Sequence, residues 1–181
     1  MYILFNTRSS RIGLILSSIL FLAITGCSKK QSVRLPDAEI IHQNQDQLTQ
    51  VIIYDVFTPP VASRLYVYSA LAAYEAIRFS QEGSASIAEK LHGFDKMPQP
   101  EKEKEYNFTL AASKAFFNVV RNVKVFSVDS LNSYEESLYG SFKEQLDDSV
   151  YARSLTFGDK VAGAILARAK QDGYFQSRGK P

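Results

Sequence analysis

Two consecutive prolines interrupt an otherwise apolar helical pattern in the segment Val51–Ile77, which reads VIIYDVFTPPVASRLYVYSALAAYEAI. Apolar residues recur at helical spacing up to Phe57, and a second run of this kind begins at Val61. Proline lacks a backbone donor and keeps the residue before it out of the α conformation, so Pro59-Pro60 must separate the two runs. The segment therefore predicts two helices that meet at a tight corner.

Two residues of opposite charge flank this corner. Asp55 lies just before the prolines, and Arg64 lies within the first turn and a half of the second helix. Both have apolar neighbours, and they are close enough in sequence to form an ion pair across the corner. We therefore assign a structural corner to Asp55, Pro59, Pro60 and Arg64, with a partly buried pair between the two charged residues.

The rest of the chain carries further helical patterns and no alternating stretch long enough for a sheet. Apolar spacings of three and four predict five long helices, which run from Asp37 to Phe57, from about Val61 to Phe79, from a charged start at 101–105 to Val119, from Ser127 or Asp129 to Leu146, and from Asp148 or Ser149 to Ala169 with an exit at Asp172-Gly173. The predicted fold class is all-α, a multi-helix bundle of about five long helices.

The first residues have the pattern of a secretion signal. Arg8 and Arg11 precede an uncharged, mostly apolar stretch from Ile12 to Ile24, which is too short for a membrane-spanning helix of about 20 residues. The stretch runs into Ile24-Thr25-Gly26-Cys27, which resembles a bacterial lipobox, where a peptidase cuts before a lipidated cysteine. An ordinary signal peptide with an incidental cysteine is the alternative.

The lipobox divides the chain into three parts. We predict a lipoprotein signal peptide over 1–27 with lipidation at Cys27, a polar tether over 28–36 and a helical domain over 37–181. The acylated Cys27 would bind a lipid membrane and place the protein in the cell envelope. Ser28 resembles an outer-membrane sorting signal, so we expect a lipid anchor in the outer membrane.

Charge excludes one class of partner. The chain has 21 Lys and Arg residues, of which the signal removes Arg8 and Arg11, against 19 Asp and Glu residues. The mature chain is therefore neutral, and it shows no stripe of basic residues with interleaved aromatics. We predict no nucleic-acid partner.

The corner segment resembles the N-terminal helical region of bacterial vanadium-dependent haloperoxidase-like lipoproteins, relatives of the type 2 phosphatidic acid phosphatases. That family carries HD-x-x-SPPVASR-x-Y-x-Y-x-x-x-A-x-YE here, and this chain follows it with Tyr54 in place of the histidine and Thr58 in place of the serine. The turn Lys90–Gly93 with the proline linker after it, Ala111–Phe116 and Tyr151–Ala169 also fit, and the resemblance spans about Gln47 to Gly179. It implies that the domain is the N-terminal half of a larger helical fold and is truncated.

The resemblance also implies where the chemistry of a full-length member lies. Such enzymes hold vanadate, or the phosphate that it mimics, with a K-x6-RP element, a PSGH element and an SR-x5-H-x3-D element, all in the C-terminal half. None of these occurs here; Lys170 and Arg178 are one residue too far apart, and Gly179 stands where proline is needed. We assign no catalytic residue, no metal ligand and no cofactor to this chain, and we expect vanadate only in a full-length member.

The two histidines do not supply a site. His42 belongs to a polar helix face, Ile41-His42-Gln43, and is expected in solvent. His92 precedes Gly93 at a helix end, where a cationic ring suits the helix dipole.

Two functional hypotheses follow. In the first, the chain is the N-terminal helical part of a membrane-anchored haloperoxidase-like protein, inactive alone, and its partner is the missing C-terminal catalytic half. In the second, it is a self-standing helical envelope lipoprotein with a binding or scaffolding role. A fragment should expose an apolar surface larger than the few hundred Å² usual on a monomer, whereas a self-standing protein should have polar residues there.

Overall fold

A computed structural model describes residues 37–123 and 127–177 of the chain. The predicted signal peptide over 1–27, Cys27 and the tether over 28–36 lie outside the described residues. The described helices are α2 (Asp37–Tyr54), α3 (Pro59–Ile77), α4 (Phe108–Asn122), α5 (Val128–Lys143), α6 (Asp148–Gln171) and the short α7 (Tyr174–Ser177), with 3-10 turns η1 (Arg78–Ser80) and η2 (Ala88–Lys90). No strand occurs in this part of the chain, so the predicted all-α bundle is confirmed.

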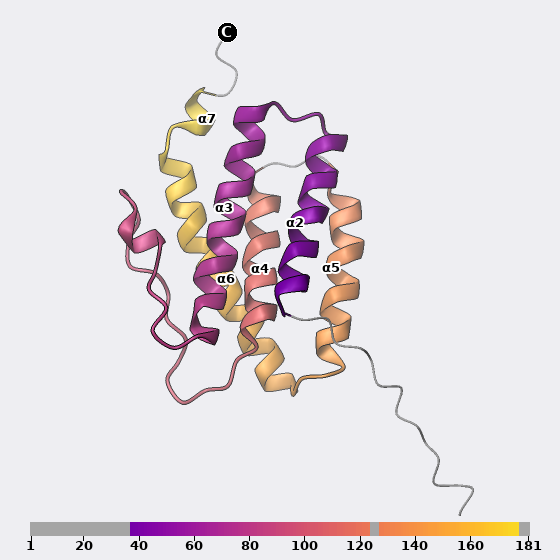
Figure 1. Ribbon diagram of the computed structural model, residues 1–181, viewed down its shortest axis with the longest axis vertical. Helices are drawn as coiled ribbons and strands as arrows, with labels where there is room; N and C mark the ends of the chain where they lie inside the picture. The colour runs from indigo at the N-terminus through magenta and orange to yellow at the C-terminus, as the bar shows by residue number, and fades with distance from the viewer. Residues whose placement is uncertain (1–36, 124–126, 178–181) are drawn as a thin grey trace, which may run out of the picture. The chain divides into compact units, whose positions relative to one another are not determined.

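Helix α4 lies at the centre of the bundle and packs against α2, α3, α5 and α6 (Figure 1). Leu110, Ala111, Phe117 and Val120 are fully buried, although they point to different sides of this helix. A helix that is apolar on most of its circumference must be surrounded by other elements. The sequence of α4 thus explains why the other long helices arrange themselves around it.

Helices α4 and α6 approach each other closely at Gly158. A Cβ atom at this position would lie 2.5 Å from the carbonyl oxygen of Ala111 and 2.7 Å from the Cβ of Lys114. Glycine is required here for packing rather than for its backbone freedom, because it stands inside a helix. The contact fixes where α6 crosses α4.

The corner between α2 and α3 forms as predicted, but α2 ends at Tyr54 rather than at Phe57. The N–H of Phe57 donates to the carbonyl of Ile52 (3.1 Å) and the N–H of Val56 to that of Ile53 (3.2 Å). These two bonds form a Schellman motif, in which the residue at the position of Val56 adopts a left-handed conformation. Val56 accordingly has φ 53, a conformation that glycine usually provides.

The start of the third long helix also differs from the prediction. Residues 101–105 are not helical, and α4 begins at Phe108, because the side chain of Asn107 accepts a hydrogen bond from the backbone N–H of Leu110. Asparagine is a strong N-cap, and it competes successfully with the weaker preference of glutamates for a first turn.

A buried carboxylate holds the long connector between α3 and α4. Glu75 is 1% exposed, and its Oε1 accepts hydrogen bonds from Ser86 Oγ (3.0 Å) and from the backbone N–H groups of Ile87 and Ala88 (both 2.8 Å). Its Oε2 accepts from Arg78 Nε (3.0 Å). The charge of Glu75 is therefore paired and fully hydrogen-bonded, as a buried carboxylate requires.

Candidate functional site

The predicted ion pair across the corner is wrong. Arg64 instead pairs with Asp172, just after the end of α6, through Nη1 to Oδ2 and through Nη2 to Oδ1 (2.8 Å). The Nη2 group also donates to the carbonyl of Ala169 (2.8 Å). The rotation of α3 turns Arg64 toward α6, and this rotation is set by the buried face of α3 rather than by the corner.

Two tyrosines complete the surroundings of Arg64. The guanidinium carbon lies 4.7 Å from the ring centre of Tyr68 and 4.2 Å from that of Tyr174, and the hydroxyl of Tyr68 donates to Asp172 Oδ2 (2.6 Å). Burial lowers the pKa of Arg64, and the neighbouring tyrosines act in the opposite direction. We call Arg64, Tyr68, Asp172 and Tyr174 the Arg64 clasp. The Nη1 and Nη2 groups of Arg64 both donate to protein oxygens, those of Asp172 and Ala169, so the clasp is a structural joint.

Asp55, the other charged residue of the predicted corner, binds the start of α5. Its Oδ1 accepts from Ser127 Oγ (2.5 Å) and its Oδ2 from the backbone N–H of Ser127 (3.2 Å). Ser127 is the N-cap residue of α5. The two charged residues of the corner thus fasten two different helices, α5 and α6, to the α2–α3 hairpin.

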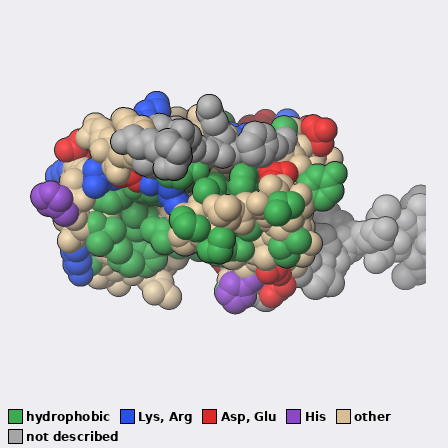
Figure 2. Space-filling model, turned by 90° about the horizontal axis from the view of Figure 1, so that it is seen from above, with side chains coloured by type: hydrophobic (Ala, Val, Ile, Leu, Met, Phe, Trp, Pro, Cys, Tyr) green, Lys and Arg blue, Asp and Glu red, His purple; other side chains and the backbone are tan. Residues whose placement is uncertain are grey.

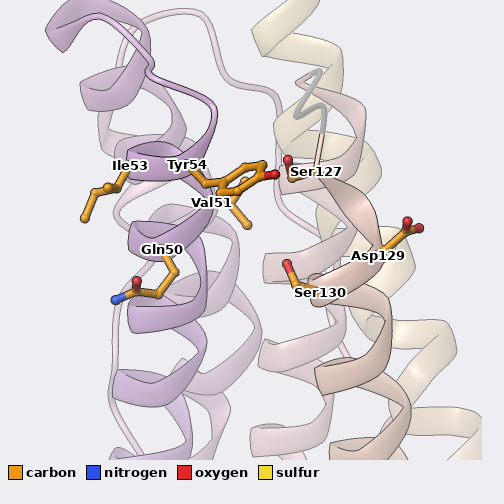
Figure 3. A pocket seen from close by; sticks show the side chains of 7 residues that line it. All are labelled: Gln50, Val51, Ile53, Tyr54, Ser127, Asp129 and Ser130. Carbon is orange, nitrogen blue, oxygen red and sulfur yellow. The ribbon is translucent and has the colours of Figure 1, made fainter.

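One hollow lies beside the corner, between the end of α2 and the start of α5 (Figure 3). It has a volume of about 580 Å³ and is lined by Gln50, Val51, Ile53, Tyr54, Ser127, Asp129 and Ser130. Figure 3 shows Val51, Tyr54, Ser127 and Ser130 directed into the space between the two helices, whereas Ile53 and Asp129 point away from it. The volume falls in the range of small-molecule sites.

The described lining of this hollow does not suit an oxyanion. A tetrahedral anion such as vanadate needs several guanidinium or ammonium donors close together. None of the described lining residues is Lys, Arg or His, and one of them, Asp129, is acidic. Hydroxyl and amide groups without a cation can hold water or a neutral polar molecule there.

A second hollow, of about 300 Å³, does contain cations but neutralises them. It is lined by residues of α4 and α5, and its Arg121 pairs with Glu135 and donates through Nε (3.2 Å) and Nη2 (2.9 Å) to Asn132 Oδ1. Its Lys114 lies 3.6 Å from Asp159 Oδ1. Burial raises the pKa of Tyr139 in the same hollow, which keeps its hydroxyl neutral.

The remaining candidates are also accounted for in the described part of the chain. His42 and His92 are both exposed, and no group of three or more His, Cys, Asp and Glu residues that could hold a metal occurs among the residues searched. None of the described helices is long and apolar enough to cross a membrane.

No sequence pattern identifies Tyr68, Asp172 and Tyr174 as members of the clasp or Ser127 as the partner of Asp55. The sequence assigns Asp172 only to a helix exit with Gly173, whose φ of 84 matches that prediction. The C-terminal end of a helix favours positive charge, so an acidic residue such as Asp172 is unusual there. Its position is a signal that a basic partner comes from elsewhere in the chain.

No family model matches the chain, and no curated protein matches it. A matching solved structure is the crystal structure of a bacterial vanadium-dependent iodoperoxidase, with a TM-score of 0.74 and 31% sequence identity. The match covers 84% of this chain but only 37% of the iodoperoxidase chain. The chain thus has a haloperoxidase-like fold. It spans well under half the length of that relative.

Proposed function

We propose that this chain is the N-terminal helical part of a vanadium-dependent haloperoxidase-like protein and has no oxidation chemistry of its own. The observation that carries the proposal is the match to the iodoperoxidase, which covers 84% of this chain at 31% identity and leaves most of the iodoperoxidase chain unmatched. The corner motif of the sequence supports the same assignment. In this role the helices are a scaffold against which a catalytic part packs.

The distribution of charge supports the absence of chemistry. Catalysis on an oxyanion depends on donors that are already arranged around the developing charge in a site shielded from water. Arg64 and Arg121, two partly buried arginines of the described helices, are each paired with a carboxylate. Either guanidinium could bind an anion only after its partly buried ion pair had been broken.

We further propose that the chain is a lipoprotein of the cell envelope. Support comes from the apolar stretch that ends at Gly26-Cys27. Acyl chains contribute about 0.8 kcal/mol for each buried CH₂ group, so a multiply acylated Cys27 would hold the domain firmly at a bilayer.

The surface favours a fragment over a self-standing binding protein. Ile53, Tyr54 and Val56 are 66%, 79% and 83% exposed, so the corner presents large apolar side chains to solvent. A self-standing scaffold protein should have polar residues at such positions.

Activity measurements test the proposal. The purified chain, supplied with vanadate, peroxide and iodide, should form no iodine above background, while the iodoperoxidase under the same conditions serves as the positive control. Calorimetry should detect no vanadate binding beyond weak, salt-screened association. Turnover that is lost in His42→Ala or His92→Ala would refute the proposal, because it would show that the chain builds its own site.

A further inference from the structure

The outer face of α3 carries no charged side chain. Its exposed residues are Pro59, Pro60, Ser63, Val67 and Ala70. The charged residues of this helix, Arg64 and Glu75, both turn inward to form ion pairs. A surface helix of a soluble protein normally shows charged and polar residues on its outer side, and depletion of charge is typical of the core of a protein interface.

The neighbouring part of α2 continues this surface. Of the six large hydrophobic side chains exposed in the described part of the chain, three lie at the end of α2 and the corner and one lies on α3, and these are Ile53, Tyr54, Val56 and Val67. Figure 2 looks onto the end of the bundle where the corner lies and shows hydrophobic side chains gathered there. Val56 has a left-handed backbone conformation, which costs a valine more free energy than a glycine. Its apolar side chain is nevertheless exposed to solvent.

An apolar hollow of about 250 Å³ opens between α2 and α3 below this region. Its lining is mostly apolar in exposed area and consists of Ile41, His42, Gln45, Ala70, Ala73, Tyr74, Ile77 and, from the central helix α4, Phe116. The small side chains of Ala70 and Ala73 let another helix approach closely, much as alanines do inside a bundle. We define the α2–α3 face as this hollow together with Ile53, Val56 and Val67.

Charge indicates the kind of segment that fits this face. Helix α2 contains Asp37, Glu39 and Asp46 and no Lys or Arg, whereas the outer side of α3 is uncharged. The described fold has no strand edge to which an extended peptide could add. A helix with an apolar stripe and with basic residues on the flank that meets α2 is therefore complementary to the face.

We propose that the α2–α3 face is the docking surface for such an amphipathic helix, supplied by the polypeptide that completes the haloperoxidase-like protein. This inference rests on the proposed function, in which a counterpart of the unmatched majority of the iodoperoxidase chain packs against these helices. The apolar stripe of the helix lies in the hollow over Ala70, and its end reaches the corner at Ile53 and Val56.

Thiol labelling of the full chain tests this docking. In a Cys27→Ser background, Ala70→Cys puts a thiol on the α2–α3 face, and Ala152→Cys puts a matched one on the exposed side of α6. Each variant is co-expressed with the part of the iodoperoxidase chain outside the match. In the purified complex the Ala70→Cys thiol should react with a maleimide at least tenfold more slowly than in the chain alone, with no change for Ala152→Cys. Likewise, Ala70→Glu should abolish co-purification and Ala152→Glu should not.

The possible failures are distinguishable. A complex in which the Ala70→Cys thiol stays fully reactive would overturn the docking surface and leave the proposed function intact. If no complex forms with any variant, the proposed function fails, and the docking surface fails with it. If the thiol is already protected in the chain alone, and light scattering gives twice the chain mass, the occupant is a second copy and the proposal is overturned.

Discussion

Arg64 and Asp172 join the start of α3 to the end of α6, although they lie 108 positions apart in the chain. Their side chains are 13% and 12% exposed, so both charges are largely removed from water. Bidentate pairing of a guanidinium with a carboxylate fixes orientation as well as distance. The pair therefore determines how α6 ends against the α2–α3 hairpin.

Removing one partner of this pair should destabilise the protein strongly. We expect Arg64→Ala to lower the free energy of unfolding by about 3 kcal/mol, because it leaves the Asp172 carboxylate buried without its counter-charge. Denaturant unfolding of Arg64→Ala, Asp172→Ala and the double variant measures the coupling, and the double variant should lose clearly less than the sum. By contrast, the losses of Asp55→Ala and Arg64→Ala should add. Coupling between Asp55 and Arg64 would restore the ion pair expected from the sequence.

Gly158 should resist the substitution that helix propensity favours. Alanine is a better helix former than glycine by about 1 kcal/mol, but its Cβ would press against the backbone of α4 at Ala111. Overpacking of this kind costs about 1–3 kcal/mol, so we expect Gly158→Ala to lower stability. Gly163 in the same helix has nothing within 4 Å of its Cβ position, and Gly163→Ala should raise stability by about 0.5–1 kcal/mol. Thermal unfolding of both variants provides the comparison, and a gain in both would refute the close helix contact.

Val56 is a site where glycine should stabilise the free chain. A left-handed conformation costs a non-glycine residue about 1–2 kcal/mol, and Val56 is 83% exposed, so its side chain contributes little packing. After the greater entropy of glycine in the unfolded chain is allowed for, Val56→Gly should add about 0.5–1 kcal/mol to the free energy of unfolding. Val56→Ala is the control, because alanine removes the two exposed methyl groups and keeps the Cβ atom that strains a left-handed backbone. Equal effects of the two variants would show that the backbone is not strained.

Sequence patterns located the helices well because each has an apolar face that a spacing of three and four reveals. The ends were less predictable. The end of α2 depends on a Schellman motif closed at Val56, a residue with no preference for it, and the start of α4 depends on the Asn107 cap rather than on the glutamates before it. The partner of Arg64 could not be predicted from the sequence. Its identification depends on the rotation of α3 and on the position of Asp172, a residue from the far end of the domain.

Lipidation at Cys27 is a prediction that the described residues do not address. Cys27→Ala should abolish labelling by a radioactive fatty acid and leave an uncleaved precursor, because the signal peptidase of lipoproteins acts only before an acylated cysteine. The change in electrophoretic mobility and the distribution between membrane and soluble fractions measure both effects. Cleavage and labelling at the same place in the variant would show that the lipobox assignment is wrong.

Removing the hydroxyl of Tyr139 should stabilise the protein. This oxygen is buried and has no hydrogen-bond partner among the described residues, and an unsatisfied buried hydroxyl costs about 1–3 kcal/mol. Tyr139→Phe should therefore raise the free energy of unfolding by about 1 kcal/mol at pH 7, whereas Tyr54→Phe, at an exposed position, should leave it unchanged.

Burial also raises the pKa of Tyr139 above its ordinary value of 10.0, so the folded protein keeps a proton that the unfolded chain releases. Stability must then fall as the pH rises above about 10, and this fall should be smaller in Tyr139→Phe. Urea unfolding at pH 7 and pH 11 measures both effects, and an identical fall in the variant and the parent would show that Tyr139 is not the titrating group.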